Sequence, residues 1–267
     1  MLPLEQGIRN KIIAKGVPLS EWNLSINYGI KTGFNDAFII TSEKKDELIS
    51  EDPKSADIIR PILRGRDIKR YSYSFADLWI IALFPSRHYD IDCYPAIKKH
   101  LLSYGIERLE QTGRRYLVNG IEIRARKKTN NKWYETQDSI QYWNDFNKQK
   151  IVYREISEEM NACLVEENFM LNNKCYLITG DHLIYILSYL NSKLFTKIIL
   201  PQANITGGKG EAFLNGISLI LPPDKIEKKI EKLYELRNRG YNVEEEIEKI
   251  FGLLYRLTDE EIEYIVN

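Results

Sequence analysis

The chain has 267 residues, of which 43% are hydrophobic and 28% charged, and its formal net charge at pH 7 is zero. This composition is sufficient for a sizeable hydrophobic core and argues against an intrinsically disordered chain. No apolar run approaches the roughly 20 residues that cross a bilayer, and the amino-terminal stretch MLPLEQGIRNKI lacks the continuous apolar core of a secretory signal. We therefore expect a soluble, cytoplasmic protein with no membrane partner.

The hydrophobic pattern of the first half predicts a mixture of helices and strands. Residues 4–15 are expected to form a short amphipathic helix, and residues 44–50 a second one. Residues 22–30 and 35–41 are predicted as strands on either side of a loop. Further strands are predicted at residues 77–85, 120–127, 150–157, 161–168 and 174–180.

Two longer helices are predicted among these strands. Apolar residues three and four positions apart indicate a helix over residues 94–111 and another over residues 181–199. Asp181 is the expected cap of the second helix, and Asn191-Ser192 is its expected weak point.

The carboxy-terminal part, residues 224–267, reads as two or three helices that carry both acidic and basic residues. Thr258 and Glu261 have the spacing of a capping box at the start of the last of these helices. The predicted fold class is therefore α+β, with a mixed, β-rich domain at residues 1–223 and a helical segment at residues 224–267.

Charge is distributed unevenly along the chain. Residues 60–154 contain 19 Lys and Arg residues against 10 Asp and Glu, a net charge of +9, whereas residues 211–267 have a net charge of −5. A basic segment of this kind attracts a polyanion through phosphate contacts and counterion release.

Two glycine-containing stretches are similar to nucleotide-binding loops only superficially. In NYGIKTGFNDAF, residues 27–38, Lys31 and Thr32 precede Gly33 and do not open a helix, which argues against a P-loop. ITGGKGEAF, residues 205–213, lacks the surrounding strand and helix of a dinucleotide site. We interpret it as a loop from which Lys209 reaches an anionic ligand.

Motifs for catalysis or metal binding are weak. The histidines and cysteines show no metal-ligand spacing; they are His88, His100, His182, Cys93, Cys163 and Cys175. The string PDKIEKK places Asp224 and Glu227 as a nuclease motif would, but both fall within one turn of a predicted helix that Pro223 would begin. The Asn/Asp-Pro-Pro-Tyr motif of amino-methyltransferases is absent. We therefore assign no catalytic residue and no metal site.

Two basic segments have the composition of a nucleic-acid contact. The first, IIRPILRGRDIKRY at residues 58–71, contains Arg64, Arg66, Lys69 and Arg70. These side chains suit phosphates or guanine, although the segment is equally typical of a solvated turn in which Asp67 is the internal partner. The second, RARKKTNNKWYETQ at residues 124–137, is the stronger candidate. It contains Lys127, Lys128, Asn130, Asn131, Lys132 and Trp133, which supply phosphate anchors, amides able to read adenine, and a ring that stacks or packs the loop.

Several stretches, in this order, resemble the TaqI-like carboxy-terminal specificity domain. This domain occurs in adenine-specific DNA methyltransferases and in type IIG restriction-modification enzymes. The stretches are INYGIKTGFNDAFII, ADIIRPILRGRDIKRY, YPAIKKHLLSYGIERLEQTG, KKTNNKWYETQDSIQYWNDFNKQKIVYREIS and YILSYLNSKLF. The resemblance runs from about Ile8 to Pro223, and it implies a target-recognition domain that holds duplex DNA against a separate catalytic domain.

The resemblance also implies the partners of the chain. These are double-stranded DNA and a methyltransferase catalytic domain, with or without an endonuclease, in cis or in trans. S-adenosylmethionine is expected in that catalytic domain and no cofactor in this chain, because the methyltransferase motifs are absent from it. The chain would then be part of a DNA methyltransferase or restriction enzyme, without catalysis of its own, either as an excised domain or as a separate specificity subunit.

This interpretation gives each candidate residue a role. The predicted phosphate contacts are Arg64, Arg66, Lys69, Lys127, Lys128 and Lys132. The predicted probes of base edges are Asn130, Asn131, Arg114 and Arg115. The turn with Lys31, Thr32 and Asn35 is expected to bring backbone close to a phosphate. Two alternatives remain open: a metal-dependent nuclease subunit, and a protein-interaction subunit that uses the helical tail.

Overall fold

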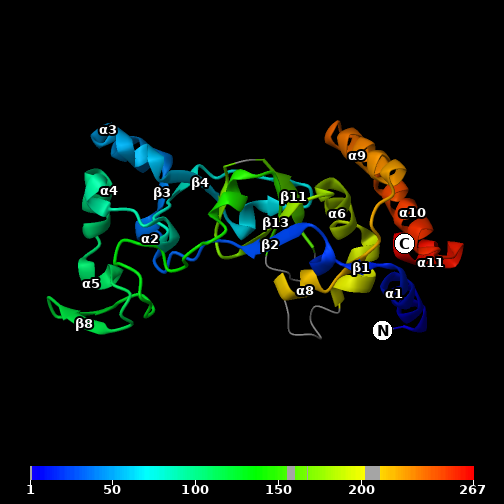
Figure 1. Ribbon diagram of the computed structural model, residues 1–267, viewed down its shortest axis with the longest axis horizontal. Helices are drawn as coiled ribbons and strands as arrows, with labels where there is room; N and C mark the ends of the chain where they lie inside the picture. Colours follow the sequence, from blue (N-terminus) through cyan, green and yellow to red (C-terminus); the bar gives the residue numbers. More distant parts are fainter. Residues whose placement is uncertain (1, 155–159, 167, 202–210) are drawn as a thin grey trace.

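Two four-stranded sheets form the middle of the molecule. The computed structural model describes residues 2–154, 160–166, 168–201 and 211–267, and these form an elongated body with helices toward both ends (Figure 1). The first sheet has the order β11-β10-β13-β2 and is antiparallel; its strands are Ala162–Val165 (β11), Lys150–Arg154 (β10), Cys175–Gly180 (β13) and Leu24–Tyr28 (β2). The second sheet has the order β12-β4-β7-β3; its strands are Met170–Leu171 (β12), Ile59–Leu63 (β4), Leu78–Ile81 (β7) and Ile39–Thr41 (β3).

The other strands form three two-stranded pairs. These are Val17–Pro18 (β1) with Ser218–Leu219 (β14), Ile68–Lys69 (β5) with Ser72–Tyr73 (β6), and Arg115–Val118 (β8) with Ile121–Arg124 (β9). Short strands of this kind alternate with helices along the chain, and most pairs are antiparallel. The predicted α+β class is therefore confirmed.

Strand β10 shows how the middle of the molecule is packed. Successive side chains of a strand point to opposite faces. Ile151 and Tyr153 accordingly belong to a core that extends to the helices at one end, whereas Val152 belongs to a second core with residues of both sheets, such as Ile62 and Leu177. Because both faces are covered, the strand is a nearly continuous apolar run, which is why its position was predictable from the sequence.

One end of the molecule is helical. Its helices are Pro3–Lys15 (α1), Leu183–Leu190 (α6), Glu211–Asn215 (α8), Asp224–Asn238 (α9), Glu244–Tyr255 (α10) and Asp259–Val266 (α11). The tail packs closely on α6: Phe251 has its ring centroid 5.5 Å from that of Tyr185 and 5.2 Å from that of Tyr189. The division at residue 223 stays a prediction, since the helices beyond it share one core with α1 and α6. No helix in the described part of the chain is both long and apolar enough to cross a bilayer.

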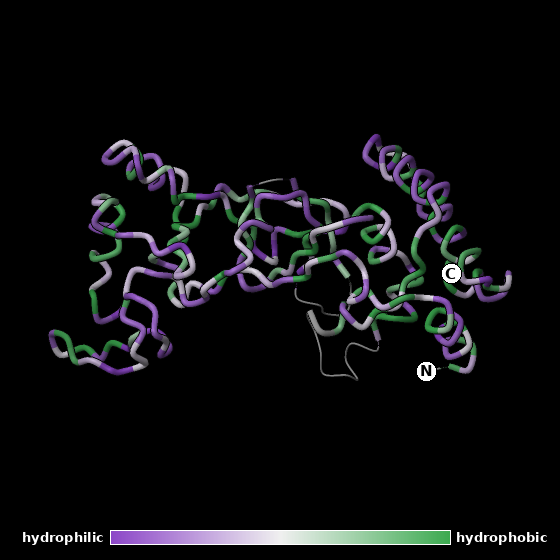
Figure 2. Tube along the Cα trace, viewed as in Figure 1, coloured by the Kyte–Doolittle hydropathy of each residue, from purple (hydrophilic) through white to green (hydrophobic). Residues whose placement is uncertain are grey.

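The opposite end carries four short helices and the β8–β9 hairpin. The helices are Asn35–Phe38 (α2), Ser42–Glu51 (α3), Pro95–Leu102 (α4) and Ile106–Leu109 (α5). They cover a third core that includes Phe38, Leu48, Ile97 and Leu109. The hairpin projects beyond these helices (Figure 1), and Figure 2 shows that much of it is hydrophobic.

Three predicted elements differ from the structure. Residues 35–38 form a helical turn where a strand was predicted, because the Thr32 hydroxyl accepts a hydrogen bond from Phe34 N and starts a turn there. The predicted helix over residues 94–111 is interrupted at Gly105, whose φ is +85°. Asp181 does not cap α6: its carboxylate accepts a hydrogen bond from Asn23, and left-handed His182 precedes the helix.

Other expected features of the helices are confirmed. Helix α6 ends at Leu190, directly before the predicted weak point, and residues Phe195–Ile199 continue as a π-helix. Helix α9 begins at Asp224 after Pro223. The capping box of α11 is present, with Thr258 Oγ1 accepting from Glu261 N and Glu261 Oε2 accepting from Thr258 N.

Candidate nucleic-acid interface

The loop after β2 is bound to the second basic segment. Lys31 N donates to the Asp138 carboxylate at 3.1 Å, and Lys31 O accepts from the backbone N–H groups of Gln137 and Asp138 at 3.1 and 3.2 Å. These bonds join the two segments that the sequence analysis selected separately, although about a hundred positions separate them along the chain. Lys31 uses only its backbone in these bonds, and the residue is exposed.

Glycines in this loop permit close approach within the protein. A Cβ atom on Gly29 would lie 2.0 Å from the carbonyl oxygen of Asn172. Gly33 has a φ of +80°, and a Cβ atom there would lie 3.0 Å from side-chain atoms of Arg126 and Gln137. Gly29 and Gly33 therefore serve packing between segments, which is a different reason from the close approach to a phosphate that the sequence analysis gave.

Arg126 connects the loop to the rest of this end of the molecule. Its side chain is buried, and its guanidinium donates to four backbone carbonyl groups, those of Leu109 (2.7 Å), Thr32 (2.8 Å), Glu135 (2.8 Å) and Trp133. Burial lowers the pKa of Arg126 to about 10, so the group remains charged at neutral pH. Arg126 lies in the basic segment at residues 124–137, and a run of charges in a sequence gives no signal that one member is buried.

Thr32 and Asn35 fix the turn. Thr32 is 1% exposed, and its hydroxyl donates to Asn35 Oδ1 at 2.7 Å and accepts from Phe34 N at 3.1 Å. Asn35 thus supports the turn in the way its position in the sequence suggested. Because its hydrogen is committed to Asn35, the Thr32 hydroxyl is not free to donate to a phosphate.

The first basic segment divides into paired and exposed cations. Arg64 forms a two-pronged bond with the buried Asp67, at 2.9 and 2.8 Å, and this hydrogen bonding raises its pKa. Arg70 donates to the carbonyl oxygen of Asn191 and pairs with Glu244 of α10. Arg66 and Lys69, by contrast, are exposed and have no carboxylate within ion-pair distance among the described residues.

The second basic segment is divided in the same way. The Asn131 amide donates to the carbonyl oxygens of Thr136 and Gln137, at 3.2 and 2.9 Å, and so closes its own loop. Trp133 is half-buried against the third core, with its ring 5.4 Å from that of Tyr134. The exposed members are Arg124, Lys127, Lys128, Asn130 and Lys132.

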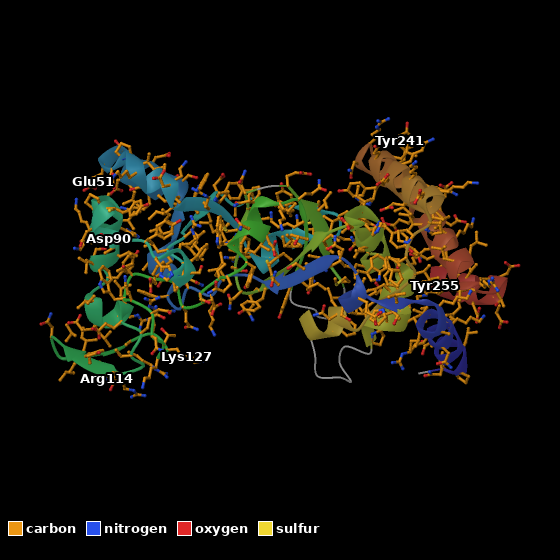
Figure 3. All side chains as sticks on the ribbon, in the orientation of Figure 1. Glu51, Asp90, Arg114, Lys127, Tyr241 and Tyr255 are labelled. Atoms are coloured by element: carbon orange, nitrogen blue, oxygen red, sulfur yellow. The ribbon has the colours of Figure 1, made fainter. Side chains whose placement is uncertain are left out.

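Arg114 and Arg115 lie at the start of the β8–β9 hairpin. Arg114 and Lys127 are at the same end of the molecule, as their side chains in Figure 3 show. Arg115 forms an ion pair with Glu122 at 3.0 Å, in which both side chains are more than 60% exposed. Such a surface pair is worth about 0–1 kcal/mol, so Arg115 can exchange this partner for another anion.

Other candidate residues have separate positions. Lys209 lies outside the described residues. Glu227 bonds His182, with 2.6 Å between Oε1 and Nδ1, which gives this carboxylate a partner within the protein. Within residues 2–154, 160–166, 168–201 and 211–267, no group of three or more His, Cys, Asp or Glu side chains is placed to hold a metal ion.

A cleft of about 520 Å³ beside β4 was not predicted. Its walls include Tyr89, Tyr94 and Trp143, and the guanidinium of Arg87 lies 3.9 Å from the centre of the Trp143 ring. Aromatic rings and arginines are the side chains on which nucleobases stack. These residues come from separate segments of the chain, so no local motif in the sequence indicated the cleft.

Comparison with known proteins places the chain in a family. Residues 60–209 match the TaqI-like C-terminal specificity domain, and the chain belongs to this family. No curated protein matches the sequence.

Two solved structures share the fold. One is the type IIL restriction-modification enzyme MmeI in complex with DNA, with 16% identity, a TM-score of 0.55, and coverage of 94% of this chain and 37% of that one. The other is the type IIG restriction endonuclease BpuSI, with 13% identity, a TM-score of 0.54, and coverage of 99% and 32%. The present chain thus spans about a third of each of these enzymes.

Proposed function

We propose that this chain is the DNA target-recognition module of a restriction-modification system, either an adenine-N6 methyltransferase or a type IIG enzyme. It binds a specific duplex sequence and positions that DNA for a separate catalytic domain. Membership of the specificity-domain family is the observation that carries this proposal. The basic loops joined through Arg126 support it, because they concentrate exposed cations at one end of the molecule.

The contacts within the protein refine the predicted contacts with DNA. Arg64, Arg70, Thr32 and Asn131 have partners within the chain, and we assign them to the framework. The proposed phosphate contacts are the exposed cations Lys31, Arg66, Lys69, Lys127, Lys128 and Lys132. The proposed base-edge probes are Asn130, Arg114 and Arg115, since long exposed donors without a fixed buried partner can follow the groove.

The catalytic chemistry belongs to a partner in this proposal. A methyltransferase domain, in cis or in trans, binds S-adenosylmethionine and modifies the target, with or without an endonuclease. The chain itself positions the DNA for this catalytic domain, and we propose that it does so in the cytoplasm. The two solved structures named above are of restriction-modification or restriction enzymes of greater length, which fits this division of labour.

The salt dependence of duplex binding tests the proposal. Neutralising six phosphates gives a log-log slope of affinity against salt of about −5, because each phosphate contributes about −0.9. The double variant Lys127→Ala/Lys128→Ala removes two of these contacts and should reduce the magnitude of the slope to about 4 or less. Lys249→Ala is the matched control, because Lys249 is an exposed cation paired with Glu245 on α10. Absence of binding to any duplex at low salt, or a slope near zero, would refute the proposal.

A further inference from the structure

The β8–β9 hairpin ends in aliphatic side chains that no other described part of the chain covers. Leu117 is 77% exposed and Ile121 is 68% exposed. Between them lies a two-residue turn in which Asn119 and Gly120 both have positive φ, +51° and +80°. Turns of this type join two strands tightly with the right-handed twist that a hairpin needs. The tip is therefore narrow, with Leu117 opposite Glu122 on one face of the hairpin and Ile121 opposite Val118 on the other.

The base of the same hairpin is held in place. Tyr116 donates its hydroxyl hydrogen to the Glu110 carboxylate, and its oxygen lies 3.2 Å from Thr112 Oγ1. Gly113 N donates to Arg126 O, which links the hairpin to the buried arginine. The tip thus projects from an anchored base (Figure 1), and Figure 2 shows its apolar character.

Positive charge surrounds the hairpin strands. Arg115 is directly opposite Arg124 in the strand register, and like charges at such positions destabilise a hairpin. Arg108 adds a third guanidinium, because its Nη1 donates to the carbonyl oxygen of Arg124 at 3.1 Å. Glu122 is the only acidic residue between positions 112 and 128. This arrangement is complementary to a polyanion and unsuited to a neutral protein surface.

We propose that the hairpin tip inserts Leu117 and Ile121 between base pairs of bound DNA, while the exposed cations of the proposed function hold the phosphates. The inference rests on the proposed function and adds a means of distorting the duplex, which exposed cations alone do not supply. Aliphatic side chains inserted in this way unstack a base step and kink the duplex by about 20–90°. Burial between bases also removes from water the two large side chains that the free protein exposes.

DNA bending by the full chain tests this inference. The probe is a short duplex from the sequences that the chain enriches from a random pool, with dyes at both ends for energy transfer and with 2-aminopurine as a reporter of unstacking. The test variant is Leu117→Ser/Ile121→Ser, which alters only exposed positions. The control is Leu253→Ser, because Leu253 is 72% exposed on α10 at the other end of the molecule.

The wild-type chain and the control should kink the duplex and raise 2-aminopurine fluorescence. The double variant should leave the duplex straight and bind about tenfold more weakly, with an unchanged salt slope, because its phosphate contacts remain. Wild-type binding without a kink or a fluorescence change, or equal bending by the double variant, overturns the wedge and leaves the proposed function standing. Failure of the wild-type chain to bind any duplex overturns both.

Discussion

Replacing Arg126 tests which residues of the basic segment 124–137 stabilise the fold and which contact DNA. Arg126 and Lys127 are neighbours in one basic run, yet the first is buried and the second exposed. Arg126→Ala should destabilise the fold, whereas Lys127→Ala should weaken DNA binding without affecting stability. The comparison is informative because both variants remove one positive charge from adjacent positions.

Arg126 bonds four carbonyl groups, and that of Glu135 also accepts from Gln111 Nε2, so the expected size of the effect follows from the other three. Each buried acceptor left without a partner lowers the free energy of unfolding by about 1–3 kcal/mol, and water entering the vacated space recovers part of it. We expect Arg126→Ala to lose about 4 kcal/mol, a large share of the roughly 5–15 kcal/mol that stabilises a typical domain. Arg126→Lys should lose less, because an ammonium group retains three donors.

Urea unfolding followed by tryptophan fluorescence measures this loss, and Trp133 lies in the affected segment. Lys127→Ala should remain within about 0.5 kcal/mol of the wild type, as exposed substitutions usually do. The reasoning would be refuted if Arg126→Ala kept the wild-type urea midpoint and lost DNA binding as Lys127→Ala does. Arg126 would then be a DNA contact and not a structural residue.

Three further predictions concern pH, the opening loop and the tail. Burial lowers the pKa of His100 below 6.5, so the folded chain binds fewer protons than the unfolded chain below that pH. The free energy of unfolding should therefore decrease as the pH falls from 6.5, and His100→Gln should remove part of this decrease. A urea midpoint that depends on pH in the same way in His100→Gln and in the wild type would contradict this. Lys31→Ala should weaken binding to selected and random duplexes about equally in a competition assay, and a changed preference would make Lys31 a base reader. Deleting residues 224–267 should lower the melting temperature of the rest of the chain, because Phe251 packs on Tyr185 and Tyr189; an unchanged melt would show an independent tail.

Elements defined by local chemistry were predictable from the sequence. Helix α11 follows from a capping box of four consecutive residues, and β10 from an apolar run that is covered on both faces. The turn at residues 35–38 was not predictable from the sequence. Its helical form depends on the Thr32 hydroxyl, and that group could equally have faced a ligand.

The candidate site was predictable as a set of segments but not as a set of contacts. The sequence indicated that residues 58–71 and 124–137 were basic, and the structure shows which members have partners. Asp67, three positions after Arg64, was the internal partner in one of the two interpretations of this segment, since the two residues are close along the chain. The bonds of Arg126 to Thr32 and of Arg70 to Glu244 join distant segments, and no local pattern contains that information.

Selection of bound duplexes from a random pool tests the central claim most directly. The chain should be used alone and together with a candidate methyltransferase domain, and the bound DNA sequenced after several rounds. A target-recognition module predicts enrichment of one defined motif, with the same motif in both arms. Bound DNA whose sequence composition matches the starting pool in both arms would contradict the account, since a specificity domain must prefer one sequence over others.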